Sequence, residues 1–328
     1  MMKEGKIGKN RRTSKTMNNV IGRLAPSPTG SQHIGNARTY LIAWLVARRQ
    51  QGQVILRIED IDSPRVKAEA TEQIQAELRW LGLEWDTGPI IQTTRLIRYQ
   101  QALEELKKKE LVYPCTCTRK DIEQAASAPH LEHELPPYPG TCSKRCVANA
   151  ASLTDRPYAW RFRSSSPVPS YQDMICGPVQ PRMEFGGDFV VWKNNNTPAY
   201  QLAVVVDDAE MGVTEVIRGD DLIPSTPRQI TLYQALGYAP PRFGHVPLVV
   251  GTDGKRLAKR HGDARLATLR ERGVGVEDFL GFLAWSCGWL PEMRAVTLAE
   301  LLLLFSLEKI PRGPFVLTEE ILQQLIDE

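Results

Sequence analysis

The chain has 328 residues, of which 42% are hydrophobic and 24% are charged, as in ordinary soluble globular proteins. This length is enough for one large domain with a smaller appendage. The formal net charge of +3 is too small to indicate a nucleic-acid binder by itself, because unrelated enzymes carry as much. A function that involves RNA must therefore be argued from motifs.

The first 19 residues carry six lysines and arginines against one acid, and they contain no apolar run. This pattern excludes a secretory signal peptide and predicts a solvated, disordered tail, with Met17 as an alternative start to Met1. An RNA-contacting arm is the other interpretation of the tail. No segment has an apolar run long enough to span a bilayer, so we expect a cytoplasmic protein without a membrane partner.

Strand-like and helix-like segments alternate along the first part of the chain. Hydrophobic spacing predicts buried strands at 19–26 and 54–60, and helices at 35–52, 68–82 and 94–109. Strand, helix, strand, helix in this order predicts a parallel sheet that binds ligands at the carboxyl ends of its strands.

The composition shifts toward Cys, Pro, His and charge between residues 115 and 146, which suggests an inserted subdomain. After about residue 188 the α/β character returns at 199–208 and 213–219 and in a helix at 226–237, and the chain beyond 262 is mainly helical. We therefore expect a tail at 1–19, an α/β domain at 20–262 with an insertion at about 112–147, and a helical region at 263–328.

The strongest chemical signal lies in residues 23–41, where a strand runs into a Pro- and Gly-broken loop and then into a helix. Unpaired backbone N–H groups and the positive end of the helix dipole would face one pocket, which suits a phosphate. His33 can donate a hydrogen bond to phosphoryl oxygens, and Gly35 lets a nucleotide approach the backbone closely. Taken alone, this short His-Ile-Gly sequence is more often a turn ahead of a helix.

Four of the six cysteines are clustered in the insertion, as Cys115 and Cys117 followed by Cys142 and Cys146. In a reducing compartment this uneven clustering fits a metal site better than a disulfide framework. Zinc prefers four soft or borderline ligands in a tetrahedron, and these four thiolates could supply them directly. The remaining cysteines are expected in the core or on the surface without a metal role: Cys176 and Cys287.

Residues 25–38 resemble the first motif of class I aminoacyl-tRNA synthetases in the form used by the glutamyl branch. That family has His-Ile-Gly-His, whereas this chain has Asn36 at the last position, which can still donate a hydrogen bond. Residues 256–260 resemble the second motif, Lys-Met-Ser-Lys-Ser; Lys259 keeps the charge, and Ala258 replaces the serine. The resemblance implies a Rossmann-like fold and a mobile loop that clamps ATP phosphates. The positions it assigns to ATP are His33, Gly35, Asn36 and Lys259, of which His33 and Lys259 are the catalytic ones.

The amino acid that the resemblance implies is glutamate, whose two carboxylates and one ammonium need at least two cationic or strong donor groups and one anion. Arg23 and Arg218 supply the cations, Glu59 can take the ammonium, and Tyr200 can close the pocket. Taken alone, each charge is about as often an ordinary surface ion pair. Which arginine holds which carboxylate stays open. The positions assigned to glutamate are Arg23, Leu24, Ala25, Pro26, Ser27, Glu59, Tyr200 and Arg218.

The insertion resembles the zinc subdomain of one synthetase subfamily, in which three cysteines and a tyrosine bind one structural zinc ion. The corresponding set in this chain is Cys115, Cys117, Tyr138 and Cys142. Cys146 stays open as a rival to the phenolate. His130 and His133 are more distant candidates.

The length favours the short members of the glutamyl branch, which attach glutamate to queuosine at the wobble position of tRNA(Asp). Only 66 residues follow Gly262 in a chain of 328, too few for both the stem-contact region and the anticodon-binding domain of full glutamyl-tRNA synthetases. The resemblance implies ATP- and Mg²⁺-dependent formation of glutamyl-adenylate by a monomer, with the anticodon arm of tRNA(Asp) entering the catalytic cleft. A truncated conventional synthetase, a non-catalytic RNA-binding paralogue and a nucleotidyltransferase of similar fold are the rivals.

Overall fold

The computed structural model of the chain describes residues 20–28, 32–61, 68–125, 138–164, 167–180, 182, 186–257 and 264–327. The expected tail and the distant metal candidates His130 and His133 lie outside these residues. The same is true of Lys259 and Ala258 in the second motif. The expectations for these positions therefore stay predictions.

Three parallel strands form the first sheet, in the order β1 (Ile21–Leu24), β2 (Gln53–Ile58) and β3 (Thr87–Ile91). The strands expected at 19–26 and 54–60 and their parallel pairing are confirmed. The sequence analysis missed β3, because its five residues include a glycine and a proline, which are both depleted in strands.

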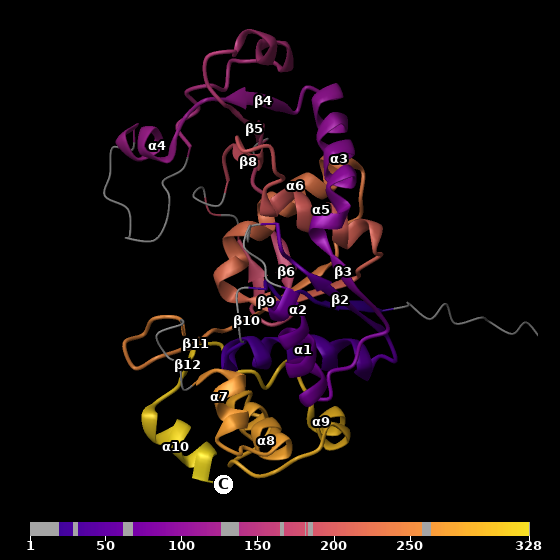
Figure 1. Ribbon diagram of the computed structural model, residues 1–328, viewed down its shortest axis with the longest axis vertical. Helices are drawn as coiled ribbons and strands as arrows, with labels where there is room; N and C mark the ends of the chain where they lie inside the picture. Colours follow the sequence, from indigo (N-terminus) through magenta and orange to yellow (C-terminus); the bar gives the residue numbers. More distant parts are fainter. Residues whose placement is uncertain are drawn as a thin grey trace, which may run out of the picture.

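The helices expected in this part of the chain are confirmed as α1 (Ile34–Arg49), α2 (Ala68–Trp80) and α3 (Leu96–Lys108). A 3-10 turn, η1 (Gln92–Arg95), leads into α3. Most of α1 is buried, because it lies between the parallel strands and the C-terminal helices (Figure 1). Its position in the middle of the molecule fixes its first turn at the edge of the sheet.

A second sheet contains β6 (Tyr171–Asp173), β7 (Gly177–Val179), β9 (Glu215–Gly219) and β10 (Arg242–Val246), in the order β7-β6-β10-β9. β10 runs parallel to both β9 and β6, whereas β7 is antiparallel to β6. The expected α/β character of the segment at 213–219 is confirmed by β9.

The two sheets meet where β9 lies beside β1. The Thr214 N–H donates to the Ile21 carbonyl at 2.9 Å, and the Arg23 side chain donates to the Ile217 carbonyl at 2.9 Å. Because the contacts advance in the same direction along both strands, β1 and β9 run parallel. The carboxyl ends of β1, β2, β9 and β10 therefore lie at one edge, where α/β sheets bind their ligands.

Helix α5 (Tyr200–Glu210) precedes β9 in the chain. After β9 come the 3-10 helix η4 (Asp220–Ser225) and helix α6 (Thr226–Leu236). The sequence analysis did not decide whether the segment at 199–208 is a strand or a helix. It is a helix despite three consecutive valines, because burial on several faces outweighs their β preference. The predicted helix at 226–237 is confirmed, and it ends at Gly237 with a left-handed φ of 77°.

A third, antiparallel sheet has the order β4 (Val112–Cys115), β5 (Ala159–Phe162), β8 (Phe189–Trp192). Helix α4 (Arg119–Ala125) follows β4 in the chain. Figure 1 shows this sheet at the end of the molecule opposite to the C-terminal helices. Its strands come from a longer stretch of chain than the insertion expected at about 112–147, whose limits stay a prediction.

The last part of the chain is mainly helical, as expected. A parallel pair, β11 (Val249–Val250) and β12 (Phe315–Val316), ties it to the loop after β10. One hydrophobic core is shared by α1, α2 and these helices. No helix among the described residues is long and apolar enough to cross a membrane. The C-terminal helices are α7 (Leu266–Glu271), α8 (Val276–Ser286), α9 (Leu298–Leu304) and α10 (Glu319–Asp327).

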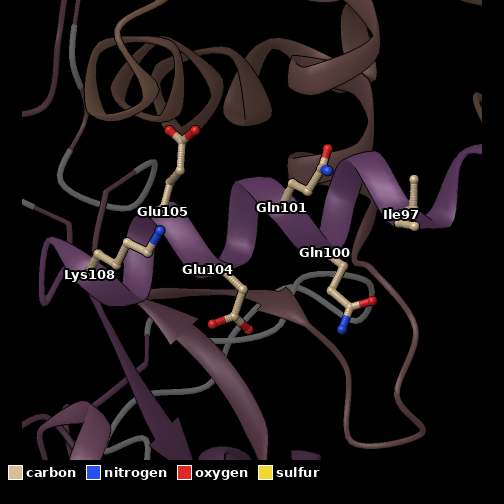
Figure 2. Close-up of a pocket in the computed structure, with 6 residues that line it drawn as sticks. All are labelled: Ile97, Gln100, Gln101, Glu104, Glu105 and Lys108. Carbon is tan, nitrogen blue, oxygen red and sulfur yellow. The ribbon is translucent and has the colours of Figure 1, made fainter.

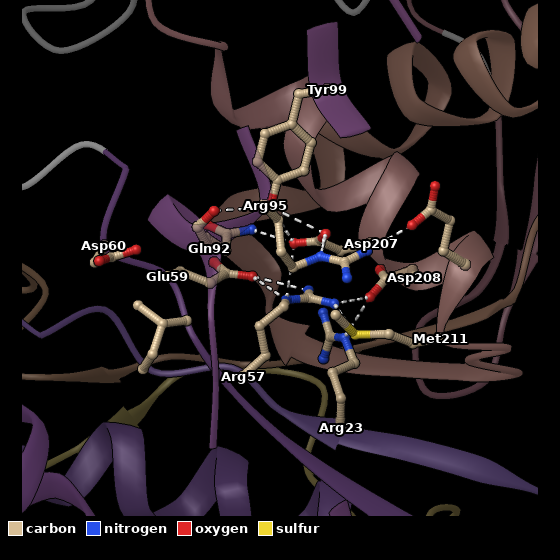
Figure 3. Close-up of polar contacts among 12 residues, drawn as sticks. Arg23, Arg57, Glu59, Asp60, Gln92, Arg95, Tyr99, Asp207, Asp208 and Met211 are labelled. Atoms are coloured by element: carbon tan, nitrogen blue, oxygen red, sulfur yellow. Dashed lines mark hydrogen bonds and ion pairs between the residues drawn. The ribbon is translucent and has the colours of Figure 1, made fainter. Parts of the chain in front are cut away.

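A network of buried charges joins β2 to α5 and η1 (Figure 3). The side chain of Arg57 is fully buried; it contacts Asp208 at 2.6 Å and Glu59 at 2.9 Å. Asp207, the neighbour of Asp208, is also fully buried and pairs with Arg95 at 2.7 Å. Each carboxylate therefore has a guanidinium partner, as buried charges require.

The network predicts a large loss of stability when Arg57 is removed. Arg57→Met leaves Asp208 and Glu59 without their closest cation, so the free energy of unfolding should fall by about 3–5 kcal/mol in urea denaturation. Arg294→Met is the control, because Arg294 and Glu300 form an exposed pair at 3.5 Å whose loss should change the stability little. Equal, small losses in both variants would contradict the role given to the network.

Candidate active site

A cavity of about 650 Å³ lies at the carboxyl ends of β1, β2, β9 and β10. Two of the predicted residues that the structure describes do not line it: the Leu24 side chain packs in the hydrophobic core, and Pro26 accepts the Glu59 N–H through its carbonyl at 2.9 Å. Lys259 lies outside the described residues, so its place stays a prediction. The predicted residues that line the cavity are Arg23, Ala25, Ser27, His33, Gly35, Asn36, Glu59, Tyr200 and Arg218.

His33 and Asn36 form a reciprocal cap at the start of α1. The Asn36 side-chain oxygen accepts the His33 N–H at 3.2 Å, and the Asn36 N–H donates to His33 Nδ1 at 3.4 Å. Because Nδ1 accepts, the neutral ring carries its proton on Nε2, which can donate to a phosphoryl oxygen. The side-chain oxygen of Asn36 thus serves the helix backbone, a use that the sequence analysis did not foresee.

Gly35 leaves room for the His33 ring. A Cβ at residue 35 would lie 3.0 Å from His33 Cε1 and 3.1 Å from Nδ1, so with a side chain here the ring would have to shift by a few tenths of an ångström. The glycine thus keeps the imidazole against the helix N-terminus, where backbone N–H groups attract anions.

The described part of the second motif lines the same cavity. Leu257 is buried, and Arg256 forms an ion pair with Asp221 of η4 at 2.6 Å. This pair joins the loop after β11 to the segment after β9. Asp221 was not among the predicted residues, because exposed acids in a turn carry no signal in the sequence.

Arg218 is held by neutral groups. It donates from Nε to His245 Nε2 at 3.1 Å, from Nη1 to Gln229 at 2.8 Å and from Nη2 to the Thr226 hydroxyl at 2.7 Å. Among the residues that the structure describes, no carboxylate forms an ion pair with Arg218. Two of its five N–H groups remain, and its charge is left for an anion that enters the cavity.

Arg23 and Glu59 face the cavity from the network behind them. Arg23 lies 3.6 Å from Asp208, its Nε has no hydrogen-bond partner, and burial lowers its pKa. Glu59 accepts both hydrogen bonds from Arg57 through Oε1, and burial raises its pKa. Tyr200, at the first turn of α5, lines the cavity beside them, and burial raises its pKa too.

A second hollow, of about 420 Å³, lies along α3 (Figure 2). All the residues that line it belong to this one helix, and they include none of the predicted site residues. We assign no site to it.

The structure brings three of the four clustered cysteines together. The sulfur atoms of Cys115, Cys117 and Cys142 lie within 4.8 Å of one another, and the Tyr138 hydroxyl lies 3.4 Å from Cys115 and 3.7 Å from Cys117. Cys146 is exposed and outside this group, at the start of η2 (Val147–Ser152), where its sulfur contacts Asn149. The geometry therefore assembles the set implied by the resemblance, with tyrosine in place of the rival cysteine.

The thiols of this group differ in acidity. Burial alone would raise the pKa of Cys142, but hydrogen bonds from the Thr116 N–H and from Tyr138 bring it down to about 7. Burial raises the pKa of Cys117 to about 11. A thiol with a lowered pKa is readily available as a thiolate, the form that binds metals.

Residues 19–298 match the family described as tRNA synthetases class I (E and Q), catalytic domain. A protein of Rhodopirellula baltica named Glutamyl-Q tRNA(Asp) synthetase is 50% identical over 295 residues, which cover 85% of this chain and 88% of that protein. One of the same name from Symbiobacterium thermophilum is 46% identical over 317 residues, covering 93% and 98%. The chain belongs to the glutamyl-Q tRNA(Asp) synthetase family. The resemblance that the sequence analysis reported is thereby confirmed.

The structure of this chain is similar to the crystal structure of a glutamate tRNA ligase from Elizabethkingia meningosepticum, in complex with its amino acid. The TM-score is 0.79 at 27% identity, over 94% of this chain and 68% of that one. The predicted class I α/β catalytic fold is confirmed.

The sequence analysis missed the residues that hold the predicted ones in place. Arg57, Asp207 and Asp208 support Arg23 and Glu59 from behind the cavity. Two adjacent acids in an otherwise apolar helical run were the one available signal, because acids are rarely buried without a cationic partner.

Proposed function

We propose that this chain activates glutamate with ATP as glutamyl-adenylate and transfers the glutamyl group to queuosine in tRNA(Asp). The names of its relatives, at up to 50% identity over most of the chain, support both the amino acid and the acceptor. Membership in the class I synthetase family supports the use of ATP with Mg²⁺.

The observation that carries the proposal is the state of Arg218. A guanidinium that is 5% exposed, held by three neutral acceptors and not paired with a described carboxylate, is suited to a carboxylate ligand. Arg23 would hold the second carboxylate, and Glu59 would hold the ammonium.

In the first step, a glutamate α-carboxylate oxygen attacks the α-phosphorus of ATP, and pyrophosphate leaves. No protein nucleophile is needed, so the residues act by positioning and by stabilising charge. His33 Nε2–H, the first turn of α1 and Lys259 would face the phosphates, and Mg²⁺ bound to ATP would neutralise part of their charge. Arg256, which the structure pairs with Asp221, would bring the second motif over the nucleotide.

In the second step, a hydroxyl of the queuosine cyclopentenediol attacks the activated carbonyl carbon, and AMP leaves. The acceptor must therefore reach the same cavity, which places the anticodon arm of tRNA(Asp) at its mouth. A conventional glutamyl-tRNA synthetase would present the 3′ end of tRNA at this point, so the RNA product distinguishes the two.

We infer further that Cys115, Cys117, Tyr138 and Cys142 hold one structural zinc ion. Three thiol sulfurs and one phenol oxygen give the four donors that a closed tetrahedral zinc site needs, and zinc accepts both sulfur and oxygen ligands. The ion would link β4 to the segment around Cys142 and so define the expected zinc subdomain. It would take no part in the reaction.

The proposed function predicts two activities that can be measured separately. Without RNA, the protein should exchange pyrophosphate into ATP in the presence of glutamate. With tRNA, radiolabelled glutamate should appear on tRNA that contains queuosine and not on the same tRNA prepared without it. After nuclease cleavage the label should be recovered on the anticodon fragment.

Two outcomes would contradict this function. Labelling that is independent of queuosine, with glutamate on the 3′-terminal adenosine, would identify a conventional synthetase. A folded protein that shows no glutamate-dependent exchange, with or without tRNA, would not be an enzyme of this kind.

The zinc site predicts about one zinc per chain in protein purified without chelators. Cys142→Ser removes one thiolate from the group and should lower the zinc content, measured by elemental analysis. Cys146→Ser is the matched control, because this exposed cysteine lies outside the group and should leave the content unchanged. Equal loss in both variants would favour Cys146 as a ligand, and no zinc in the wild-type protein would reject the site.

A further inference from the structure

Behind Arg218 lies a buried pair that none of the proposed steps uses. His245 of β10 and Asp173 of β6 are 0% and 2% exposed, and His245 Nδ1 lies 2.6 Å from Asp173 Oδ2. The other ring nitrogen of His245, Nε2, accepts the hydrogen bond from Arg218 Nε at 3.1 Å. The three side chains form a continuous line from β6 to the wall of the cavity.

The hydrogen bonds of Asp173 keep it ionised. Its Oδ1 accepts the backbone N–H groups of Ile175 at 2.9 Å, Cys176 at 2.9 Å and His245 at 3.1 Å. Burial opposes ionisation, but the hydrogen bond from the His245 ring and the backbone donors outweigh it and lower the pKa of Asp173. An ionised carboxylate can only accept, so the proton between the two side chains sits on His245 Nδ1.

His245 is neutral in this arrangement. Burial lowers its pKa and outweighs the opposite effect of the hydrogen bond to Asp173, and the neighbouring charge of Arg218 lowers the pKa further. A neutral imidazole with its proton on Nδ1 has a bare Nε2, which can only accept. Arg218 Nε–H always donates, so Asp173 selects the one histidine tautomer that can hold the arginine.

We propose that Asp173 and His245 are positioning residues for substrate recognition, which fix the guanidinium plane of Arg218 through the choice of histidine tautomer. The hydrogen bonds to His245 and to Thr226 take Nε–H and one N–H of Nη2, and Gln229 takes one of Nη1. The remaining N–H groups are thereby held in one orientation for a carboxylate. This inference rests on the proposed role of Arg218 in binding glutamate.

The alternative is a purely structural role, in which Asp173 and His245 only tie β6 to β10. The variant Asp173→Asn distinguishes this role from the positioning of Arg218. Asparagine keeps the shape and can still accept the backbone N–H groups through its oxygen. Its NH₂ group now donates to His245 Nδ1, which moves the ring proton to Nε2. The Nε2–H then faces Arg218 Nε–H, to which it cannot bond, and it can donate only to the Thr226 hydroxyl, 3.1 Å from Nε2.

Asp173→Asn should therefore raise the KM for glutamate about 10- to 100-fold in pyrophosphate exchange, the range for losing a hydrogen bond to a charged group. The KM for ATP should change little, because Arg218 holds the amino acid. Asp188→Asn is the matched control: Asp188 accepts the Tyr113 hydroxyl at 2.6 Å and the Ser164 N–H at 2.9 Å, away from the cavity. It should leave both KM values unchanged.

His245→Gln provides a second variant, because the Gln oxygen can accept from Arg218 in place of Nε2 and has no tautomer to choose. It should raise the KM for glutamate less than Asp173→Asn does. In the His245→Gln background, Asp173→Asn should add almost nothing, so the double-mutant cycle should be strongly non-additive. Additive effects, or an unchanged KM in folded Asp173→Asn protein, would overturn the proposal.

The tautomer itself can be read by ¹⁵N NMR of histidine-labelled protein, whatever the activity. The chain has five histidines, so the His245 signals are those that His245→Gln removes. In the wild-type protein they should show a proton on Nδ1, and in Asp173→Asn a proton on Nε2. A wild-type His245 protonated on Nε2 or on both nitrogens would overturn the inference. No glutamate-dependent exchange by the wild-type protein would instead reject the proposed function and the role of Arg218 with it.

Discussion

The contact between Arg57 and Asp208 fixes strand β2 against helix α5. Both side chains are buried, and Arg57 also holds Glu59, which follows β2 directly and lines the cavity. Breaking such a contact would leave a charge in a low-dielectric interior, at a cost of several kcal/mol. The position of Glu59 and of the first turn of α5, which carries Tyr200, thus depends on this one interaction.

The buried arginines at the cavity and behind it are of two kinds. Arg57 is compensated by carboxylates and serves the architecture, whereas Arg218 is held by neutral acceptors and keeps its charge for a ligand. Arg23 is intermediate between these two kinds: its Nε lies 3.6 Å from Asp208, and the same Nε–H has no hydrogen-bond partner. An amino acid with two carboxylates fits this division, because it brings its own negative charges to the positions that lack them.

The sequence predicted the parts of the structure that follow from local patterns. The parallel strands, the helices and the cavity at the carboxyl edge follow from hydrophobic spacing and strand order, and the predicted residues that line the cavity follow from the resemblance to the glutamyl branch. β3 could not be predicted, because Gly88 and Pro89 hide a short strand that only its neighbour β2 stabilises. The helix at Tyr200–Glu210 required knowledge of its burial.

The supporting contacts were also out of reach of the sequence. Asp207 and Asp208 are 150 and 151 positions from Arg57, and nothing in a single sequence pairs residues at such distances. The capping role of Asn36 and the contact of His245 with Arg218 depend on side-chain directions that spacing does not specify. For the metal group, chemistry alone favoured the four cysteines and the resemblance named Tyr138 in place of Cys146; the fold brings Tyr138 to the three thiols.

The central claim is that the uncompensated charge of Arg218 selects a dicarboxylic amino acid. Isothermal titration of the folded protein with glutamate and with glutamine tests it most directly. The account predicts that the wild-type protein binds glutamate and discriminates strongly against glutamine, and that Arg218→Gln weakens glutamate binding by about 2–5 kcal/mol, as for the loss of one partner of a buried charge pair. Equal binding of the two amino acids, or unchanged glutamate binding by Arg218→Gln, would contradict it.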